Sequence, residues 1–248
     1  MKILATYNIK GGVGKTAAAV NLAWLSARSG LRTLVWDLDP QGAASFYFRI
    51  KPRVKGGGKK LVKGKQDLDD LIKGTDFANL DLLPADFSYR HMDLELSAGK
   101  KPEQRLDKLL APLRGEYDRI FLDCPPSISL VSEAVFRTAD LLLVPMIPTT
   151  LSLRTLEQLL AFRDRQKLKK LVILPFFSMV DRRKNLHREL VAELPERHQP
   201  FLTTAIPYAS DVELMGRQRQ PLGSFAGNRP AARAYAELWA EICGYCND

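Results

Sequence analysis

Residues 1–30, which read MKILATYNIKGGVGKTAAAVNLAWLSARSG, decide the fold of this chain. The apolar, β-prone run 2–7 predicts a short strand, and the Ala- and Leu-rich run 17–29, ended by Gly30, predicts a helix. Between them lies the turn 10–16, Lys-Gly-Gly-Val-Gly-Lys-Thr. Glycines let successive backbone N–H groups turn inward around phosphate oxygens, and the following helix adds the positive end of its dipole. The order strand, glycine turn and helix therefore predicts a phosphate-binding loop.

The two residues that close this turn have separate expected roles. The Lys15 ammonium would reach the β- and γ-phosphates of a nucleotide, and the Thr16 hydroxyl would be a ligand of Mg²⁺. The common form of the motif has glycine at position 9, whereas this chain has Ile9 followed by Lys10. A chance glycine-rich turn is the alternative, but strand, turn and helix all agree. We expect the phosphates to contact Lys10, Gly11, Gly12, Val13, Gly14, Lys15, Thr16 and Ala17.

The rest of the chain repeats the pattern of strand and helix. Further strands are expected at 32–38, 80–83, 119–124, 141–146, 171–174 and 202–206, with helices such as 151–168 and 231–242 between and after them. Apolar strands that alternate with helices indicate a parallel sheet covered on both faces. No internal repeat or long linker interrupts the pattern. The sequence thus predicts an α/β fold with one doubly wound, mostly parallel sheet, in a single domain over 1–248.

The composition is typical of a globular protein in a reducing compartment. Hydrophobic residues make up 46% of the 248 residues and charged residues 26%. The longest apolar candidate, 141–153, contains two prolines and is shorter than the roughly 18 residues that a membrane span needs. The N-terminus shows no apolar core followed by a cleavage site, and three cysteines exclude a disulfide framework. Membrane, secreted and disordered classes are therefore disfavoured, and a cytoplasmic location is expected.

The positive charge is concentrated in one segment. Residues 49–66, RIKPRVKGGGKKLVKGKQ, contain eight Lys or Arg and no acid, so the remainder of a chain with formal charge +9 carries only +1. Three consecutive glycines and scattered lysines predict a flexible loop rather than a helix or strand. A solvated, mobile insertion is one interpretation. A contact with nucleic acid or another anionic surface is the other.

Acidic residues follow two of the predicted strands. In an α/β sheet, ligands bind in the crevice at the carboxyl ends of the strands. Asp123 ends a buried strand, where an unpaired charge is costly and a hydrated Mg²⁺ would compensate it. Asp37 and Asp39 are two residues apart, so a regular strand would direct both to one face. We expect Thr16, Asp37, Asp39 and Asp123 to form the metal site, although a plain carboxylate cluster would have the same spacing.

The extra lysine at position 10 gives the loop a family resemblance. The pattern K-G-G-x-G-K-T near the N-terminus resembles the deviant Walker A motif of the ParA/MinD family of ATPases. Residues 37–42, DLDPQG, resemble the switch I of that family, and residues 118–126, DRIFLDCPP, resemble its Walker B and switch II segment. Weaker matches occur at 143–145 and 179–183. Asp-Pro-Gln-Gly and Asp-Cys-Pro-Pro are characteristic of the ParA branch, and the matches together span most of the chain.

The resemblance implies a role for individual residues. Asp39 would orient or deprotonate the attacking water, and Asp37 would hold a water molecule on Mg²⁺. Lys10 would reach across a dimer to the phosphates of the partner, so that Lys10, Lys15 and Asp39 form the catalytic set. Phosphoryl transfer of this kind depends on positioning and charge stabilisation. The adenine would lie among Met179, Pro207 and Tyr208, although a Phe-Phe-Ser-Met run is also typical of a buried core.

The resemblance also implies a cellular activity. Such an ATPase forms a homodimer on Mg-ATP, binds DNA non-specifically, and positions or segregates DNA or another cargo. Its hydrolysis is slow and is stimulated by a ParB-like partner, and its ATP form associates with the nucleoid. Contacts would be to phosphates rather than base edges. The candidate DNA residues are Arg182, Arg183 and Lys184, before an expected helix at 185–194, together with Arg217 and Arg219, whereas Asp211 and Glu213 oppose this interpretation.

Three other functions remain open at this point. A MinD-like membrane ATPase would carry a basic amphipathic C-terminal helix, but residues 231–248 contain a single arginine and no lysine. An iron–sulfur carrier could use Cys243 and Cys246, which have Cys-x-x-Cys spacing, although a frayed tail with two incidental cysteines is the favoured interpretation. A non-catalytic scaffold would not need the complete set of lysines and carboxylates. We therefore expect no membrane partner.

Overall fold

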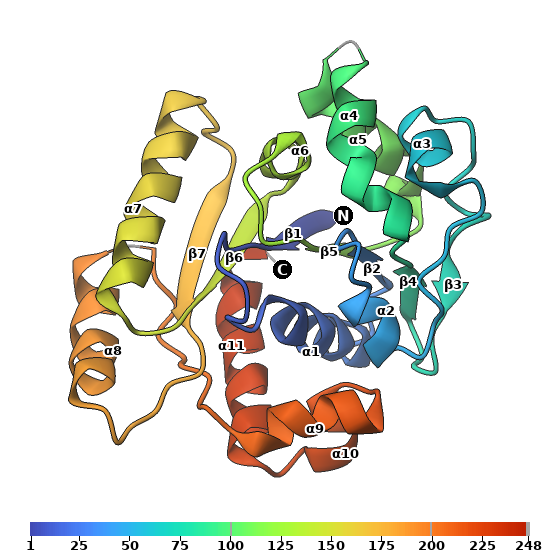
Figure 1. Ribbon diagram of the computed structural model, residues 1–248. Helices are drawn as coiled ribbons and strands as arrows, with labels where there is room; N and C mark the ends of the chain where they lie inside the picture. Colours follow the sequence, from blue (N-terminus) through green and yellow to red (C-terminus); the bar gives the residue numbers. More distant parts are fainter. Residues whose placement is uncertain (100, 199, 247–248) are drawn as a thin grey trace.

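A seven-stranded sheet with helices on both faces forms the centre of the computed structural model, which describes residues 1–99, 101–198 and 200–246 (Figure 1). The strand order is β3-β4-β2-β5-β1-β6-β7, and every neighbouring pair is parallel except β3 with β4. The predicted doubly wound, mostly parallel α/β fold is therefore confirmed. The strands are β1 (Lys2–Thr6), β2 (Thr33–Asp37), β3 (Lys73–Gly74), β4 (Leu80–Leu83), β5 (Arg119–Asp123), β6 (Leu141–Met146) and β7 (Val172–Phe177).

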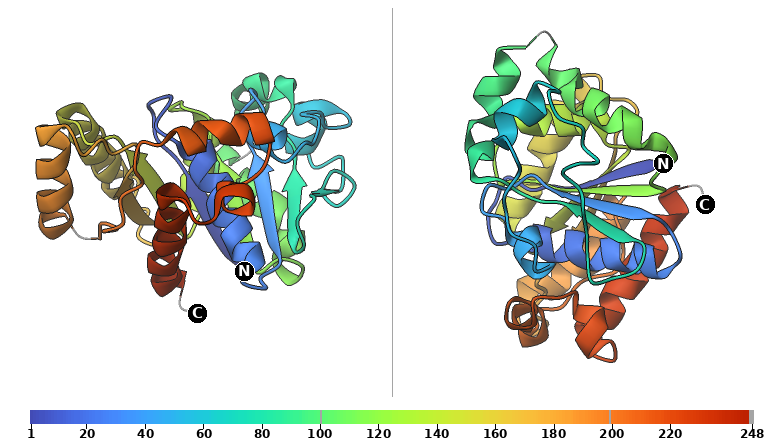
Figure 2. Two further views of the ribbon diagram at one scale, coloured as in Figure 1. Left: turned by 90° about the horizontal axis from the view of Figure 1, so that it is seen from below. Right: turned by 90° about the vertical axis from the view of Figure 1, so that its right-hand side faces the viewer.

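Helices cover the two faces of this sheet as separate layers. Helices α1 and α11 pack on one face, while α4, α5 and α6 pack on the other (Figure 1 and Figure 2). Side chains alternate along each strand, so Leu4 and Phe121 face the first layer whereas Ile3 and Ile120 face the second. The α-helices are α1 (Lys15–Arg28), α2 (Ala43–Tyr47), α3 (Gly57–Val62), α4 (Met92–Ser97), α5 (Arg105–Leu110), α6 (Leu130–Thr138), α7 (Thr150–Arg165), α8 (Asn185–Arg197), α9 (Ser210–Gln218), α10 (Leu222–Ala226) and α11 (Pro230–Cys246), and three short 3-10 helices are η1 (Phe87–His91), η2 (Pro102–Gln104) and η3 (Ala111–Gly115).

The prediction of a last strand at 202–206 is wrong. Two of its N–H groups do reach β7, from Leu202 to the Pro175 carbonyl at 2.9 Å and from Ile206 to the Phe177 carbonyl at 2.8 Å. Beyond them, Pro207 forms an isolated bridge with Val180. Proline has no N–H, so Pro175 accepts a bond from this segment but cannot return one. The segment therefore runs beside the sheet edge without a ladder, which ends at β7.

Contrary to the prediction from its composition, the basic segment 49–66 is not free of helix. It contains helix α3, and its apolar residues Val54 and Leu61 are 4% and 0% exposed. Gly56 and Gly57 have φ values of +81° and +66°, so these glycines form the left-handed turn that starts the helix. Three apolar side chains bury themselves under α4 and η1, and this packing orders a run that local composition alone would leave mobile.

The C-terminal residues form a helix instead of the expected frayed tail. Helix α11 continues to Cys246, and this cysteine is 2% exposed. Apolar residues at helical spacing place one face of α11 on the sheet, where the rings of Trp239 and Phe121 lie 6.0 Å apart. The buried residues of this face are Ala231, Ala232, Ala234, Tyr235, Leu238, Trp239, Ile242 and Cys246.

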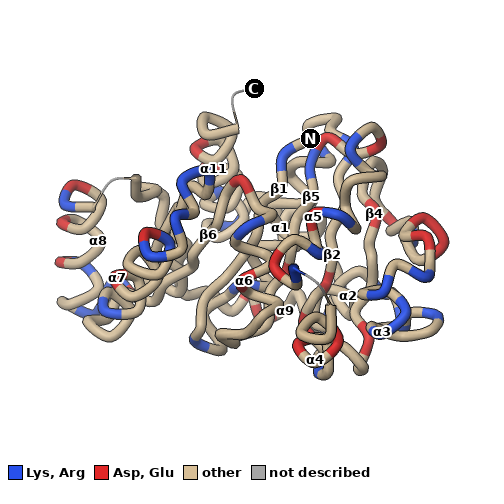
Figure 3. The backbone as a smooth tube through the Cα atoms, turned by 90° about the horizontal axis from the view of Figure 1, so that it is seen from above, with Lys and Arg blue, Asp and Glu red and all other residues tan. Residues whose placement is uncertain are grey.

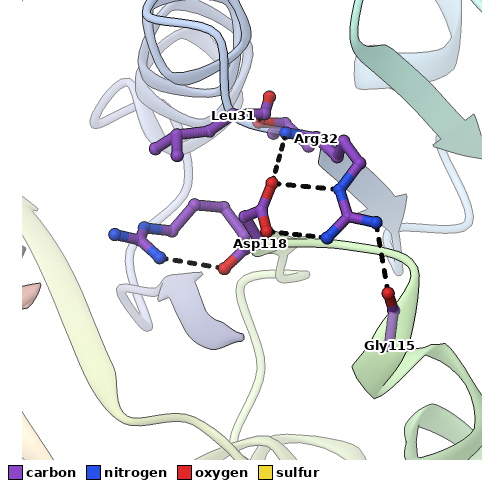
Figure 4. A network of polar contacts seen from close by, with 6 residues as sticks. Leu31, Arg32, Gly115 and Asp118 are labelled. Carbon is purple, nitrogen blue, oxygen red and sulfur yellow. Dashed lines mark hydrogen bonds and ion pairs between the residues drawn. The ribbon is translucent and has the colours of Figure 1, made fainter.

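An ion pair fixes β2 against β5 at the amino ends of the strands. Arg32 donates from its backbone N–H, Nε and Nη2 to the Asp118 carboxylate at 2.9, 3.2 and 2.9 Å, and from Nη1 to the Gly115 carbonyl at 3.1 Å (Figure 4). These hydrogen bonds hold the pKa of Asp118 down at about 2. Asp118 thus supports the sheet at the edge opposite Asp37 and Asp123.

Candidate nucleotide and magnesium site

The glycine-rich turn forms an open cradle between β1 and α1. Gly12 and Gly14 have φ values of +70° and +89°, in the left-handed region that favours glycine. A Cβ atom added at Gly14 would lie 2.9 Å from Ser178 Oγ, whereas additions at Gly11 and Gly12 would meet only open space. Gly14 also caps α1 without a side-chain hydrogen bond, so the first N–H groups of the helix remain available. The backbone therefore offers N–H donors around a space that fits an anion.

The Lys15 side chain turns back into this cradle. Its Nζ donates to the Lys10 carbonyl at 3.0 Å, and the residue is 7% exposed. Burial lowers the pKa of Lys15, while the nearby charges of Asp123 and Asp39 oppose this effect. An ammonium in such a position is compensated best by an additional anion, which is what a nucleotide phosphate supplies. The Lys10 side chain is half-exposed at the rim.

Asp123 and Asp37 end adjacent strands in register. The pairing of β2 with β5 sets Asp37 opposite Asp123, and the pairing of β1 with β5 sets Thr6 opposite Asp123. Thr6 donates to Asp123 Oδ1 at 3.2 Å, while within the described ranges Asp123 Oδ2 is buried and accepts no hydrogen bond. Burial raises the pKa of Asp123, the neighbouring Asp37 raises it further, and the nearby Thr16 hydroxyl lowers it.

This orphaned oxygen fits a Mg²⁺ site that is incomplete without phosphate. Among the residues that the structure describes, no three His, Cys, Asp or Glu side chains converge closely enough to hold a metal by themselves. Magnesium keeps several waters and binds through one or two carboxylates plus substrate phosphates. Thr16 and Asp123 would supply that protein share, because the hydroxyl lies beside the carboxylate. The donor set therefore suits Mg²⁺ that enters with a nucleotide.

The Asp37 carboxylate is held by the helix that follows it. Ser45, in α2, donates to Asp37 Oδ2 from its backbone N–H at 2.8 Å and from its hydroxyl at 2.7 Å. The same hydroxyl accepts from the Ala85 N–H at 3.0 Å. Burial raises the pKa of Asp37, and the hydrogen bonds from Ser45 oppose this rise. Asp39 is half-exposed instead, and its Oδ1 accepts from the Gln41 N–H at 2.9 Å.

Three polar residues at the site were missed in the sequence. Thr6 and Ser45 hold the two buried carboxylates. Asn8 accepts from the Lys10 N–H at 2.9 Å and donates to the Pro145 carbonyl at 2.8 Å, so it ties the start of the loop to β6. The sequence did contain a signal for each of them. Thr6 and Asn8 are polar residues at or just after the end of an apolar strand, and Ser45 lies in the first helical turn after Asp-Pro-Gln-Gly. That signal does not identify the distant partners, which are Asp123 for Thr6, Pro145 for Asn8 and Ala85 for Ser45.

A cavity of about 220 Å³ opens beside the cradle. It brings together Met179, Pro207 and Tyr208, the three residues expected near the adenine. Met179 has a φ of +55°, and the Tyr208 side chain is 55% exposed with its hydroxyl 3.3 Å from Glu213 Oε1. The remaining lining residues are Gly12, Gly14, Ala17, Tyr47, Ser178, Ile206, Ala209, Val212, Glu213 and Tyr235. The cavity thus joins the phosphate cradle to a partly apolar recess.

The expected DNA residues lie at the ends of two different helices, before α8 and at the end of α9. Arg182, Arg183 and Lys184 are exposed before α8, and Arg183 donates to Asp181 from Nε and Nη2 at 2.9 Å each. At the end of α9, Arg217 is exposed but Arg219 is not free. The Arg219 guanidinium lies 4.6 Å from the Phe46 ring centroid, and its Nε donates to the Phe46 carbonyl at 3.0 Å.

The two C-terminal cysteines lie away from the cradle. Both belong to α11, and burial raises the pKa of each thiol, with Cys246 also near Lys2 at the amino end of β1. Metal clusters bind thiolates, which a raised pKa disfavours. Packing of α11 on the sheet accounts for Cys246 without a ligand. No helix in the described ranges is long and apolar enough to cross a membrane.

The chain is similar to known proteins over most of its length. A family model described as "AAA domain" matches residues 1–172. The sporulation initiation inhibitor protein Soj of Bacillus subtilis is 31% identical over 247 residues, covering 97% of this chain and 98% of Soj. The chromosome partitioning protein ParA of Myxococcus xanthus is 34% identical over 200 residues, or 78% of this chain and 70% of that protein. A structure named cobyrinic acid a,c-diamide synthase, from Mycobacterium smegmatis with bound ADP and magnesium, is 25% identical with a TM-score of 0.84 and covers 100% of this chain and 96% of that one.

Proposed function

The chain belongs to the ParA/MinD family of deviant Walker A ATPases, and from this premise we propose that it dimerises on Mg-ATP, binds DNA non-specifically and positions DNA or another cargo. The observation that carries the proposal is the single cradle at which Lys10, Lys15, Thr16, Asp39 and Asp123 meet the carboxyl ends of β1, β2 and β5. A scaffold without catalysis would not require this set. The protein is therefore an ATPase, and its partners are the part that needs testing.

Nucleotide binding begins with the backbone of the loop. The N–H groups of residues 11–16 surround the phosphates, and Lys15 exchanges its hydrogen bond with the Lys10 carbonyl for the β- and γ-phosphate oxygens. Mg²⁺ bound there would supply positive charge that offsets the charge of the phosphates. Thr16 and Asp123 would hold it, while Met179, Pro207 and Tyr208 line the recess for the base.

Hydrolysis needs a residue that faces water, and Asp39 meets this condition. It is half-exposed, whereas Asp37 and Asp123 are fully buried. The hydrogen bond from Gln41 to Asp39 Oδ1 leaves Oδ2 to accept a proton from the attacking water. Ser45 holds Asp37 two residues away, which fixes the backbone that carries Asp39. We infer slow turnover that a ParB-like partner stimulates by ordering this exposed segment.

Dimerisation explains why the loop contains a second lysine. Lys15 already occupies the cradle, and a second ammonium beside it would be repelled. The half-exposed Lys10 instead reaches the phosphates of a facing subunit, in the manner of an arginine finger supplied in trans. The contact exists only when both subunits hold ATP. Nucleotide state thereby controls assembly through contacts that differ between the two states.

Non-specific DNA binding follows from exposed cations that contact phosphates. The candidates are Arg182, Arg183, Lys184, Arg217 and Arg219. A MinD-like membrane role has less support, because the apolar face of α11 is buried against the sheet and is not available to a bilayer. The iron–sulfur alternative has less support because burial raises the pKa values of Cys243 and Cys246.

Two lysine variants test the proposal. With Mg-ATP, Lys10→Ala should bind nucleotide with near-native affinity yet remain monomeric in size-exclusion chromatography with light scattering. Lys15→Ala should lose nucleotide affinity itself, and the exposed Lys169→Ala should behave as wild type. An ATP-dependent dimer of Lys10→Ala with normal turnover would contradict the cross-subunit role. A wild-type protein that stays monomeric at saturating Mg-ATP would contradict the dimer model as a whole.

A further inference from the structure

The basic segment, residues 49–66, presents all of its positive charge to solvent. Its eight basic side chains are exposed, whereas Val54, Leu61 and Val62 are buried beneath them. The Lys and Arg positions follow one another around α3 (Figure 3). The exposed basic residues are Arg49, Lys51, Arg53, Lys55, Lys59, Lys60, Lys63 and Lys65. In the folded protein, the apolar side chains of this segment are therefore buried, and its basic side chains form an exposed cationic surface.

Hydrogen bonds to η1 fix the conformation of the basic segment. The Val54 N–H donates to Asp86 Oδ2 at 2.8 Å, and the Gly58 N–H donates to Ser88 Oγ at 2.7 Å. A Cβ atom at Gly57 would lie 2.8 Å from Ser88 Oγ, so glycine is required for this close approach. A ligand that binds here would not need to order the backbone first, which removes an entropic cost of binding.

Most of these cations lack a partner within the protein. In the part of the chain that the structure describes, Arg49 pairs with Asp76 at 3.3 Å and Lys63 with Glu95 at 3.8 Å, and the other six basic residues form no ion pair. Six like charges on an ordered segment repel one another. An anionic partner relieves that repulsion. The positive charge of the segment also attracts anionic ligands at long range.

The basic segment follows helix α2 in the chain and contacts the end of α9. Arg49 Nη2 donates to the Gln218 carbonyl at 3.1 Å, and Arg219 packs on Phe46 of α2. Lys51 and Arg219 also line one cavity of about 440 Å³ together with residues 41–43. Arg217 is exposed and directly precedes Gln218, so it is next to this contact in the chain. Helix α2 connects the basic segment to Asp37 through Ser45.

We infer that the basic segment, together with Arg217, is the surface on which the phosphate backbone of duplex DNA docks. This inference rests on the proposed DNA binding and assigns its main contact away from Arg182, Arg183 and Lys184. A lipid surface fits less well, because membrane-surface helices insert an apolar face and the apolar residues of α3 are already buried. Phosphates spaced along a duplex match a strip of exposed cations without any apolar insertion.

Charge-removing pairs of substitutions test this surface. Lys59→Ala with Lys60→Ala removes two exposed charges from α3, and Lys169→Ala with Lys170→Ala removes two exposed charges from the turn before β7. Binding of a fluorescein-labelled duplex is measured by anisotropy with Mg-ATP over a range of salt concentrations. Each phosphate contact contributes about −0.9 to the slope of log affinity against log salt. The α3 pair should flatten that slope by up to about 1.8 and weaken binding at 0.1 M salt by about tenfold or more, and the control pair should change neither.

The outcomes separate the inference from the proposed function. Wild-type protein that binds no DNA at low salt with Mg-ATP overturns the proposed function and this inference with it. Wild-type binding that the α3 pair leaves unchanged, or that the control pair weakens equally, overturns the inference alone. Phosphatidylserine vesicles are a further probe, and their capture by wild type but not by the α3 pair, with DNA binding intact, identifies a membrane surface instead. Light scattering with Mg-ATP is the control for both pairs, which should still form the dimer.

Discussion

Replacing Ser45 by Ala removes one hydroxyl that serves two buried partners. Ser45, Asp37 and Ala85 are each 0% exposed, so water cannot replace the lost bonds. The variant loses the 2.7 Å bond to Asp37 Oδ2 and leaves the Ala85 N–H without its acceptor at 3.0 Å. A hydrogen bond to a charged group contributes about 1.5–3 kcal/mol, and an unpaired buried donor costs about 1–3 kcal/mol. Because the Ser45 N–H still holds Asp37 at 2.8 Å, we expect a total loss of about 3 kcal/mol.

Urea denaturation of the nucleotide-free protein measures this loss, and a Mg²⁺ titration of ATP hydrolysis measures its consequence at the site. Loss of a residue that orients a metal-site group typically costs 10–100-fold in metal affinity or activity. Ser26→Ala is the matched control, because Ser26 is also 0% exposed in a helix and its hydroxyl lies 2.8 Å from Thr33 Oγ1. The control should lose stability without a change in Mg²⁺ dependence. Wild-type stability and Mg²⁺ dependence in Ser45→Ala would refute the reasoning.

Three further predictions concern individual carboxylates. Asp39→Ala should keep Mg-ATP binding and dimerisation but lower turnover by about 10²–10⁴-fold, measured by phosphate release, because it removes the partner of the water and not a phosphate contact. Asp123→Asn should stabilise the nucleotide-free protein by about 1–3 kcal/mol at pH 8 in urea denaturation, because burial raises the folded pKa of Asp123 above the unfolded value of about 3.9. The gain should shrink as pH falls and vanish below about pH 3, where the wild-type carboxyl is protonated in both states, and Mg²⁺ with nucleotide should reverse it. Asp118→Asn should lower the free energy of unfolding at neutral pH and reduce its loss on acidification. The folded pKa of Asp118, near 2, lies below the unfolded value of about 3.9, so the stabilisation by the bonds from Arg32 is present above about pH 4 and is lost as pH falls through about 2. Circular dichroism during an acid titration measures this difference.

The expectations that failed share one cause. Residues 49–66 look mobile from composition, yet Val54 and Leu61 bury themselves under elements that come about 30 residues later in the chain. Residues 202–206 look like a strand from their apolar run, yet Pro175 in β7 lacks the N–H that a ladder requires. In both segments the deciding partner is distant in sequence, so no local pattern contains it.

The phosphate loop and the alternation of strands and helices can both be predicted from local sequence. Residues 10–16 are contiguous, and their glycines and flanking periodicity act within a few residues, so the local chain dictates the turn and the helix dipole behind it. The contacts that hold the carboxylates, in contrast, depend on how the whole chain folds. Thr6 meets Asp123 across 117 residues, and Ser45, which holds Asp37, meets Ala85 across 40 residues, because strand order brings these ends together. A parallel sheet collects the carboxyl ends of its strands at one edge, and the order of those strands is set by the packing of whole helices, which no short stretch of sequence encodes.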